Sequence, residues 1–235
     1  MPAPRVSGWR VAATLGLWLV LAAVVAGGTL LAVRFGFPGL LAGHRAAVGA
    51  VLVVEAYATL LAALLVAFGG WRGLRDQLGF RFTAFRHIGL ALVAWISALV
   101  VGVAATALLS PLLGQPRSNA TDLLGRSFDP VFVVLIVPTV CILAPACEEL
   151  LFRGAIFGWL RSRLPVPVAA VISAAVFAGA HLLPPLFPEL FVFGLAAALI
   201  YQRTGSTLNS FVMHATQNTT AVLIAYAVLT RRLGG

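Results

Sequence analysis

The sequence predicts an all-α fold, a polytopic transmembrane bundle of about seven helices with an eighth left open. Of the 235 residues, 61% are hydrophobic and only 10% are charged, and the mean hydropathy is +1.02. A typical globular domain has about 25% charged residues, so this composition excludes a cytosolic enzyme and a disordered chain. The apolar residues form long uninterrupted runs, whereas transmembrane β-barrels alternate apolar and polar residues. Helices that span a bilayer are therefore the expected elements.

Seven apolar stretches predict membrane-spanning helices because each approaches the length that a hydrocarbon core of about 30 Å requires. The first stretch is longer than the 7 to 15 apolar residues of a usual signal peptide, so a span is favoured over a cleaved leader. Two connections differ from the rest. The segment 71–87 mixes Arg with aromatic residues, as an interfacial segment does, and 114–130 predicts a polar surface loop that contains a glycosylation pattern, Asn119-Ala-Thr121. The predicted spans are Val11–Val33, Ala46–Trp71, Ile88–Leu113, Val131–Leu160, Val166–Leu183, Leu186–Tyr201 and Ser206–Thr230.

The positive charge is spread along the chain. All 16 cations are Arg, and they occur in ones and twos between apolar runs. No basic stripe that could follow a phosphate backbone is present in the sequence, so no nucleic-acid partner is expected. With the N-terminus inside, nine arginines flank the inner ends of the spans and six the outer ends. This bias predicts a cytoplasmic N-terminus.

Several ionisable residues lie inside the predicted spans, where each costs at least about 2.5 to 3.5 kcal/mol and therefore needs a partner or a function. Counting about 1.5 Å per residue from the inner helix ends places Glu148, His181, His214 and Asn218 within one slab about 11 Å thick near the midplane. The sequence therefore predicts that these side chains converge. The complete set of candidate residues is Glu55, Glu148, Glu149, Arg153, His181, His214 and Asn218, with Phe177 as a supporting aromatic residue.

Helical spacing suggests how these groups are divided. Glu149 and Arg153 are four residues apart and share one helix face, which predicts a neutralising ion pair that orients the helix. Glu148 is turned about 100° from that pair and is left as a candidate general base or acid. Glu55 is a candidate cavity-lining residue or a partner of an unidentified Arg. Cys147 can be read as a nucleophile, but a Cys in an apolar run is more often a small hydrophobic residue.

These residues give the chain a resemblance to the CPBP family of intramembrane proteases, which includes CAAX proteases such as the Ras-converting enzyme and bacterial bacteriocin-processing and abortive-infection proteins. The family pattern is Glu-Glu-x-x-x-Arg, then Phe-x-x-x-His, then His-x-x-x-Asn. Here Glu148, Glu149 and Arg153 match its first element, followed by Phe177 with His181 and by His214 with Asn218. The match lies within residues 131–230.

The resemblance implies peptide-bond hydrolysis by water that Glu148 and His181 activate, with His214 and Asn218 stabilising the oxyanion. Glu149, Arg153 and Phe177 are implied to be supporting residues. The family is also described as metal-dependent, which makes a divalent metal such as zinc a candidate cofactor with Glu148, His181 and His214 as its ligands. The implied partners are membrane lipid and a peptide or protein substrate, with a prenylated substrate as one option. The implied location is the plasma membrane of a bacterium.

The predicted organisation is an N-terminal set of three spans over residues 1–130, a catalytic core over 131–230 and a short Arg-containing tail over 231–235. Two other function classes remain open. A protein of the same fold can act without catalysis as a scaffold or immunity factor. A proton-coupled transporter also uses buried Glu and His residues, although it favours internal repeats, and the sequence shows no repeat.

Overall fold

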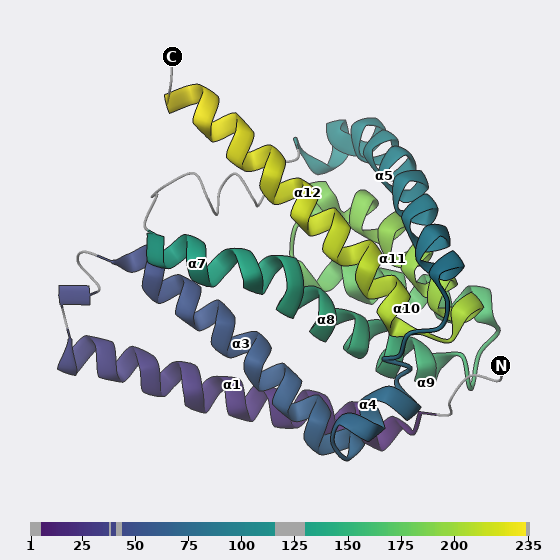
Figure 1. Ribbon diagram of the computed structural model, residues 1–235, viewed down its shortest axis with the longest axis horizontal. Helices are drawn as coiled ribbons and strands as arrows, with labels where there is room; N and C mark the ends of the chain where they lie inside the picture. The colour runs from purple at the N-terminus through teal and green to yellow at the C-terminus, as the bar shows by residue number, and fades with distance from the viewer. Residues whose placement is uncertain (1–5, 38, 41–43, 116–129, 234–235) are drawn as a thin grey trace.

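The computed structural model describes residues 6–37, 39–40, 44–115 and 130–233, and within these ranges the secondary structure consists of helices without a strand (Figure 1). The first part of the chain contains α1 (Gly8–Gly36), α3 (Arg45–Phe68), the short α4 (Trp71–Gln77) and α5 (Phe85–Leu113). The second part ends with α10 (Val166–Ala180), a short 3-10 turn η3 (Pro184–Leu186), α11 (Phe187–Thr204) and α12 (Thr207–Leu233). Between them, one continuous helical segment comprises α7 (Pro130–Pro138), η1 (Thr139–Leu143), α8 (Ala144–Glu148), η2 (Glu149–Phe157) and α9 (Gly158–Leu160).

Each of the seven predicted spans is helical, which confirms the all-α membrane fold. Among the described residues, five helical segments are long and apolar enough to cross a membrane: 8–36, 45–68, 85–113, 132–160 and 184–204. The helix α10 is apolar but shorter, with 15 residues. The helix α12 is long but more polar, because Ser206 at its start and then Thr207, Asn209, Ser210 and His214 are buried against the rest of the protein.

Several helices end at other residues than the predicted spans, and α3, for example, ends at Phe68 and not at Trp71. The span Val166–Leu183 ends at Ala180, since Leu182 adopts a φ of 54° and two prolines follow it. His181 therefore lies at the C-terminal end of α10. The predicted tail 231–235 is helical at its start, because α12 continues to Leu233. The predicted surface loop with Asn119 and Thr121 lies almost entirely outside the described residues.

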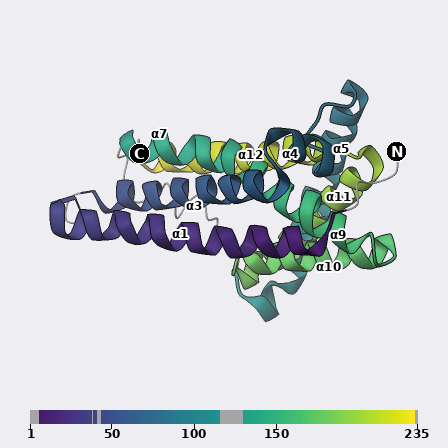
Figure 2. The same ribbon diagram turned by 90° about the horizontal axis from the view of Figure 1, so that it is seen from below.

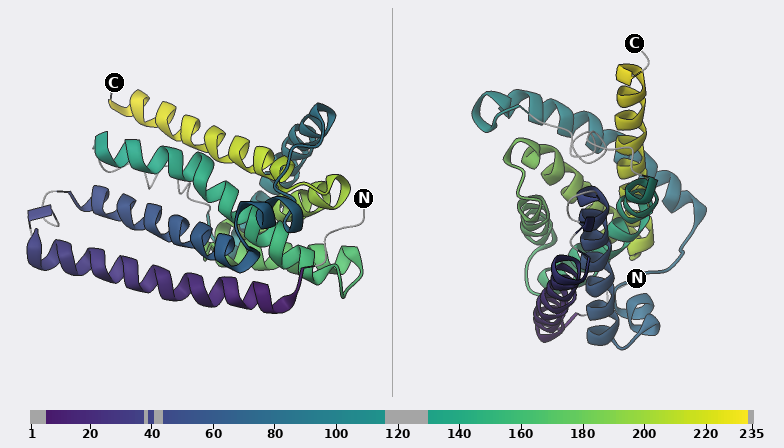
Figure 3. Two further views of the ribbon diagram at one scale, coloured as in Figure 1. Left: turned by 60° about the horizontal axis from the view of Figure 1, so that its bottom comes forward. Right: turned by 90° about the vertical axis from the view of Figure 1, so that its left-hand side faces the viewer.

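The helices form a continuous series of neighbours. α1 packs against α3, and α3 packs against α7, η1 and α8. α12 covers the other side of η1, α8 and η2, and α5 contacts both α12 and α11. α10 closes the series between α11 and η2, and the rotated views show α1, α3 and α7 as successive layers (Figures 2 and 3). Because successive spans alternate in direction, α1 begins and α12 ends at opposite ends of the molecule (Figure 1).

The central helical segment departs from α-helical hydrogen bonding where proline interrupts it. The Ala144 N–H donates to the Thr139 carbonyl, which is the i−5 bond of a π-helix. In the same register, the Val140 carbonyl would accept from residue 145, but Pro145 has no N–H. Val140 thus offers its carbonyl to another element. Wide turns of this kind are often found at functional sites, and a second one, η2, directly follows Glu148.

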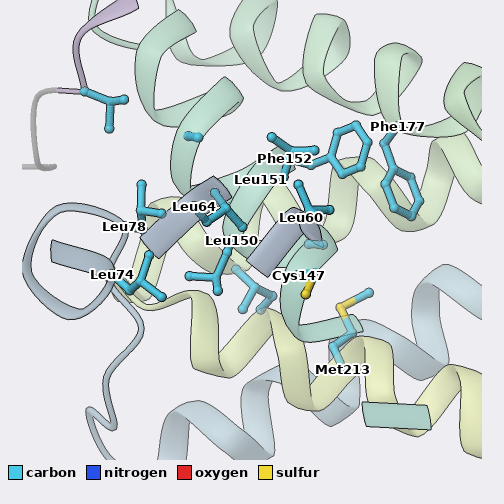
Figure 4. Packing of buried hydrophobic residues seen from close by; sticks show 14 of the residues in the cluster. Leu60, Leu64, Leu74, Leu78, Cys147, Leu150, Leu151, Phe152, Phe177 and Met213 are labelled. Carbon is cyan, nitrogen blue, oxygen red and sulfur yellow. The ribbon is translucent and has the colours of Figure 1, made fainter. Parts of the chain in front are cut away.

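The hydrophobic core lies where α3 meets the central segment. Leu60 and Leu64 of α3 belong to one buried cluster with Cys147, Leu150 and Phe177 (Figure 4). The short helix α4 and the residue that follows it add Leu74 and Leu78 to this cluster, and both are fully buried. In contrast, Trp71, Phe82 and Phe85 of the same segment are exposed, and its interfacial location stays a prediction. The core therefore fixes α3 against the helix that carries the two glutamates.

Candidate active site

Three predicted residues converge from three helices. The Nε2 atom of His181, at the end of α10, lies 3.9 Å from Oε2 of Glu148 in α8. The Nε2 atom of His214 in α12 lies 3.8 Å from the same oxygen. Glu148 and His214 are buried, and Oε2 of Glu148 has no hydrogen-bond donor among the described residues. One carboxylate oxygen therefore faces two imidazole nitrogens at a distance slightly beyond direct hydrogen bonding.

Glu149 forms the predicted ion pair and also a contact that spacing did not indicate. Its Oε1 atom lies 2.9 Å from Nη1 of Arg153 and 2.9 Å from Nδ1 of His214. The side chains of Glu149 and Arg153 are 0% and 1% exposed, so neither charge is compensated by water. Glu149 thus joins the central helix to α12 and orients the ring that faces Glu148.

The short contacts of the two histidines define which ring nitrogen carries a proton. Nδ1 of His181 lies 2.8 Å from the Phe177 carbonyl oxygen, which can only accept a hydrogen bond. Nδ1 of His214 lies 2.9 Å from a carboxylate that is ion-paired with Arg153. Both Nδ1 atoms therefore act as donors, and in the neutral form of each ring the lone pair is on Nε2, which faces Glu148.

The local fold explains why His181 can make this bond. Phe177 lies in the last turn of α10, where carbonyl groups lack intrahelical N–H partners. A residue four positions later can turn its side chain back to such a carbonyl, and His181 is the residue at the C-terminal cap. The early end of α10 is thus part of the site geometry.

Phe177 packs against three of the motif residues, Arg153, His181 and His214. Its ring centroid lies 4.2 Å from the Arg153 guanidinium carbon and 4.7 Å from the His181 ring centroid. It also contacts the rings of His214 and Phe152, and Figure 4 shows the last of these contacts. A guanidinium over an aromatic face gains cation–π stabilisation, which increases when the pair is desolvated. Phe177 supports the site by holding the buried cation.

Asn218 makes a different contact from the one its predicted role requires. Its Nδ2 atom donates to the Val140 carbonyl at 2.9 Å, the carbonyl that Pro145 cannot satisfy. This bond joins α12 to the π-helical turn η1. The oxyanion role of Asn218 stays a prediction, and in the structure Asn218 stabilises the distorted helix ahead of Glu148.

The remaining candidates have structural partners. Thr29 of α1 donates to Oε1 of Glu55 at 2.6 Å, so the described contacts of Glu55 join α1 to α3 and do not include the Glu148 cluster. The Cys147 thiol is fully buried and donates to the Tyr57 carbonyl at 3.5 Å. Its surroundings support the interpretation of Cys147 as a small hydrophobic residue.

One site residue was not predicted from the sequence. The Tyr57 hydroxyl of α3 donates to Oε1 of Glu148 at 2.6 Å. Tyr is enriched at the interfaces of membrane proteins, whereas Tyr57 lies about 18 Å into its span when counted from Arg45. A tyrosine at mid-membrane depth was the available signal.

Glu148, His181 and His214 are not spaced as the ligands of one metal ion. Within the described parts of the chain, no three or more His, Cys, Asp and Glu side chains are grouped so that they could hold a metal ion. The separations of 3.8 and 3.9 Å between Glu148 and the two imidazoles exceed the roughly 3.3 Å between donors that share a tetrahedral zinc ion with ligand distances of about 2.0–2.1 Å. The residues present therefore do not fit the implied zinc ion as they are arranged.

The second half of the chain is similar in sequence to a known protein family. Residues 130–220 match the model of the Rce1-like family, described as type II CAAX prenyl endopeptidase Rce1-like. The chain is also 31% identical over 146 residues to an uncharacterized 24.3 kDa protein of Escherichia coli. The aligned region covers 59% of this chain and 65% of that protein. The chain thus spans slightly less than two thirds of this relative. No solved structure matches.

Proposed function

We propose that the protein is an intramembrane endopeptidase, because residues 130–220 match the Rce1-like family model, described as type II CAAX prenyl endopeptidase Rce1-like. It hydrolyses a peptide bond of a membrane-associated substrate with water activated by Glu148. One observation carries this proposal: a buried carboxylate oxygen, which has no hydrogen-bond donor among the described residues, faces the Nε2 atoms of two histidines. A bilayer makes such a group costly, and packing does not require it.

In the proposed reaction, Oε2 of Glu148 takes a proton from water while the water oxygen bonds to the scissile carbonyl carbon. His181 accepts a hydrogen bond from that water at Nε2 and holds it in position. The carbonyl π electrons move to its oxygen, and the tetrahedral intermediate then breaks the C–N bond. Glu148 delivers its proton to the leaving amine, which completes the proton balance without a covalent intermediate.

His214 donates to the developing oxyanion from Nε2, and this requires the imidazolium form because Nδ1 already donates to Glu149. Carboxylate oxygens flank this ring on both sides, Glu149 at Nδ1 and Glu148 at Nε2.

The proposal is tested with purified protein in lipid nanodiscs and a peptide that carries a transmembrane or prenylated anchor. Glu148→Gln, His181→Ala and His214→Ala are each expected to lose cleavage, with a fall of about 100-fold to 10,000-fold for the general base. Glu55→Gln is the matched control, because it neutralises a half-buried carboxylate in a neighbouring span and is expected to cleave near the wild-type rate. If Glu148→Gln cleaved as fast as wild type, the mechanism would be wrong.

The same assay tests the substrate class and the cofactor. We propose that the substrate is lipidated or membrane-embedded, so the anchored peptide is expected to be cleaved faster than the same peptide without its anchor. Since Glu148 and the two histidines are not spaced as metal ligands, cleavage is expected to continue after chelation. A loss of activity that added zinc restores would instead assign a metal to these three residues.

The proposed location is the plasma membrane of a bacterium, with a cytoplasmic N-terminus. The distribution of arginines along the chain supports this orientation. Since α1 begins and α12 ends at opposite ends of the molecule, the same proposal predicts an external C-terminus. Reporter fusions at the two termini check the orientation. A cytoplasmic reporter active at the C-terminus would contradict it.

A further inference from the structure

Tyr57 is the one residue outside the Rce1-like domain with a hydrogen bond to Glu148 in the described structure. Its hydroxyl donates to Oε1 at 2.6 Å, a distance typical of a strong O–H···O⁻ hydrogen bond. The other oxygen, Oε2, has no donor in the described parts of the chain and faces His181 and His214. The two oxygens of the carboxylate are therefore distinguished by a contact from α3.

We propose that Tyr57 is a positioning residue that holds the Glu148 carboxylate in the orientation required for water activation. The last torsion of a glutamate side chain is broad and roughly two-fold, so an isolated carboxylate can rotate and exchange its oxygens. The bond from Tyr57 occupies Oε1 and leaves Oε2 as the proton acceptor. The role in catalysis rests on the proposed function, whereas the orienting contact does not.

A second hydrogen bond, from the residue that precedes Glu148 in α8, fixes the position of Tyr57. The Cys147 thiol donates to the Tyr57 carbonyl at 3.5 Å, so consecutive residues of α8 contact the main chain and the side chain of one α3 residue. Leu60 and Leu64 continue the contact along α3 within the buried cluster (Figure 4). The depth and rotation of α3 are thus set by packing, and Tyr57 reaches Glu148 as a result.

This arrangement assigns a function to the part of the chain outside residues 130–220. The matched domain supplies the general base and both histidines, but the orientation of the base depends on α3. The N-terminal helices therefore complete the catalytic geometry in addition to anchoring the protein.

The first test compares Tyr57→Phe with Tyr201→Phe. Both substitutions remove only a hydroxyl from a largely buried ring, and the Tyr201 hydroxyl has no hydrogen-bond partner among the residues that the structure describes. Tyr57→Phe is expected to lower kcat about tenfold to a hundredfold, as expected for a lost hydrogen bond to a charged group, with KM nearly unchanged. Tyr201→Phe is expected to leave kcat unchanged. Equal kcat values in the two variants, or an effect of Tyr57→Phe on KM alone, would overturn the proposal.

The second test does not depend on cleavage. The unfolding midpoint is measured for wild type, Tyr57→Phe, Glu148→Met and the double variant. If Tyr57 holds the carboxylate, Tyr57→Phe lowers the midpoint of wild type but not that of Glu148→Met. An equal shift in both backgrounds would refute the contact. If wild type cleaved no peptide while the two residues were coupled, the proposed function would fail and the orienting contact would stand.

Discussion

The buried ion pair between Glu149 and Arg153 gives the clearest prediction for stability. Arg153→Met keeps much of the side-chain volume but removes the cation that lies 2.9 Å from Glu149. Both residues are fully buried, so water cannot replace the lost partner. Breaking a buried pair by removing one partner costs about 3–5 kcal/mol.

The lower end of that range applies here, because His214 still donates to Glu149. A loss of about 3 kcal/mol corresponds to a fall in the melting temperature of about 6–12 °C for a chain of this size. The measurement is thermal unfolding in detergent, followed by the reaction of a thiol dye with Cys141 and Cys147, which are both buried in the folded state.

The matched control is Arg75→Met. Arg75 also pairs with a neighbouring carboxylate, Asp76, at 3.1 Å, but the two side chains are 64% and 59% exposed. Exposed pairs contribute about 0–1 kcal/mol, so Arg75→Met is expected to melt near wild type. The double variant Glu149→Gln with Arg153→Met is expected to recover part of the stability, because it no longer buries an unpaired charge. If Arg153→Met melted no lower than Arg75→Met, the reasoning about the buried pair would be refuted.

Two further substitutions test the packing around the site. Gly194→Val places a Cβ 3.0 Å from Ala174 Cα and 3.4 Å from the Phe177 ring. We expect the substitution to separate α10 from α11, to lower the unfolding free energy by about 1–3 kcal/mol and to reduce cleavage. Gly49→Val, at a position with open space, is the tolerated control in the melting and cleavage assays. Asn218→Leu removes the donor to Val140 and is expected to lower the unfolding free energy by about 1–3 kcal/mol together with kcat; a fall in kcat of about 100-fold or more with unchanged melting would instead indicate the oxyanion role.

The helices and the convergence of the motif residues followed from the sequence because both depend on strong local signals. Long apolar runs can only be helices or closed barrels in a bilayer, and period-two alternation is absent from this sequence. The pair Glu149 and Arg153 was predicted from its i, i+4 spacing. The depth estimated from helix rise put Glu148, His181 and His214 at one level of the membrane. In the structure, the Nε2 atoms of both histidines lie within 4 Å of Oε2 of Glu148.

The same reasoning was less accurate where backbone geometry changes. The end of α10 at Ala180 depends on the positive φ of Leu182. A leucine in a sequence does not predict a positive φ, because residues with a side chain like this rarely adopt one. Pro145 leaves one helical carbonyl ahead of Glu148 without its N–H donor, which follows from the residue type alone. Which group satisfies the freed Val140 carbonyl does not, because Asn218 is 78 residues away.

The sequence by itself determined that this is a helical membrane protein and which rare polar residues it places inside the bilayer. These properties follow from composition and from the fixed rise and rotation of a helix. Only the tertiary structure decided the partners: Tyr57 for Glu148, His214 for Glu149, Thr29 for Glu55 and Val140 for Asn218. Each of these bonds joins different helices, and its existence depends on the rotation and relative depth at which two helices pack, which no local periodicity specifies.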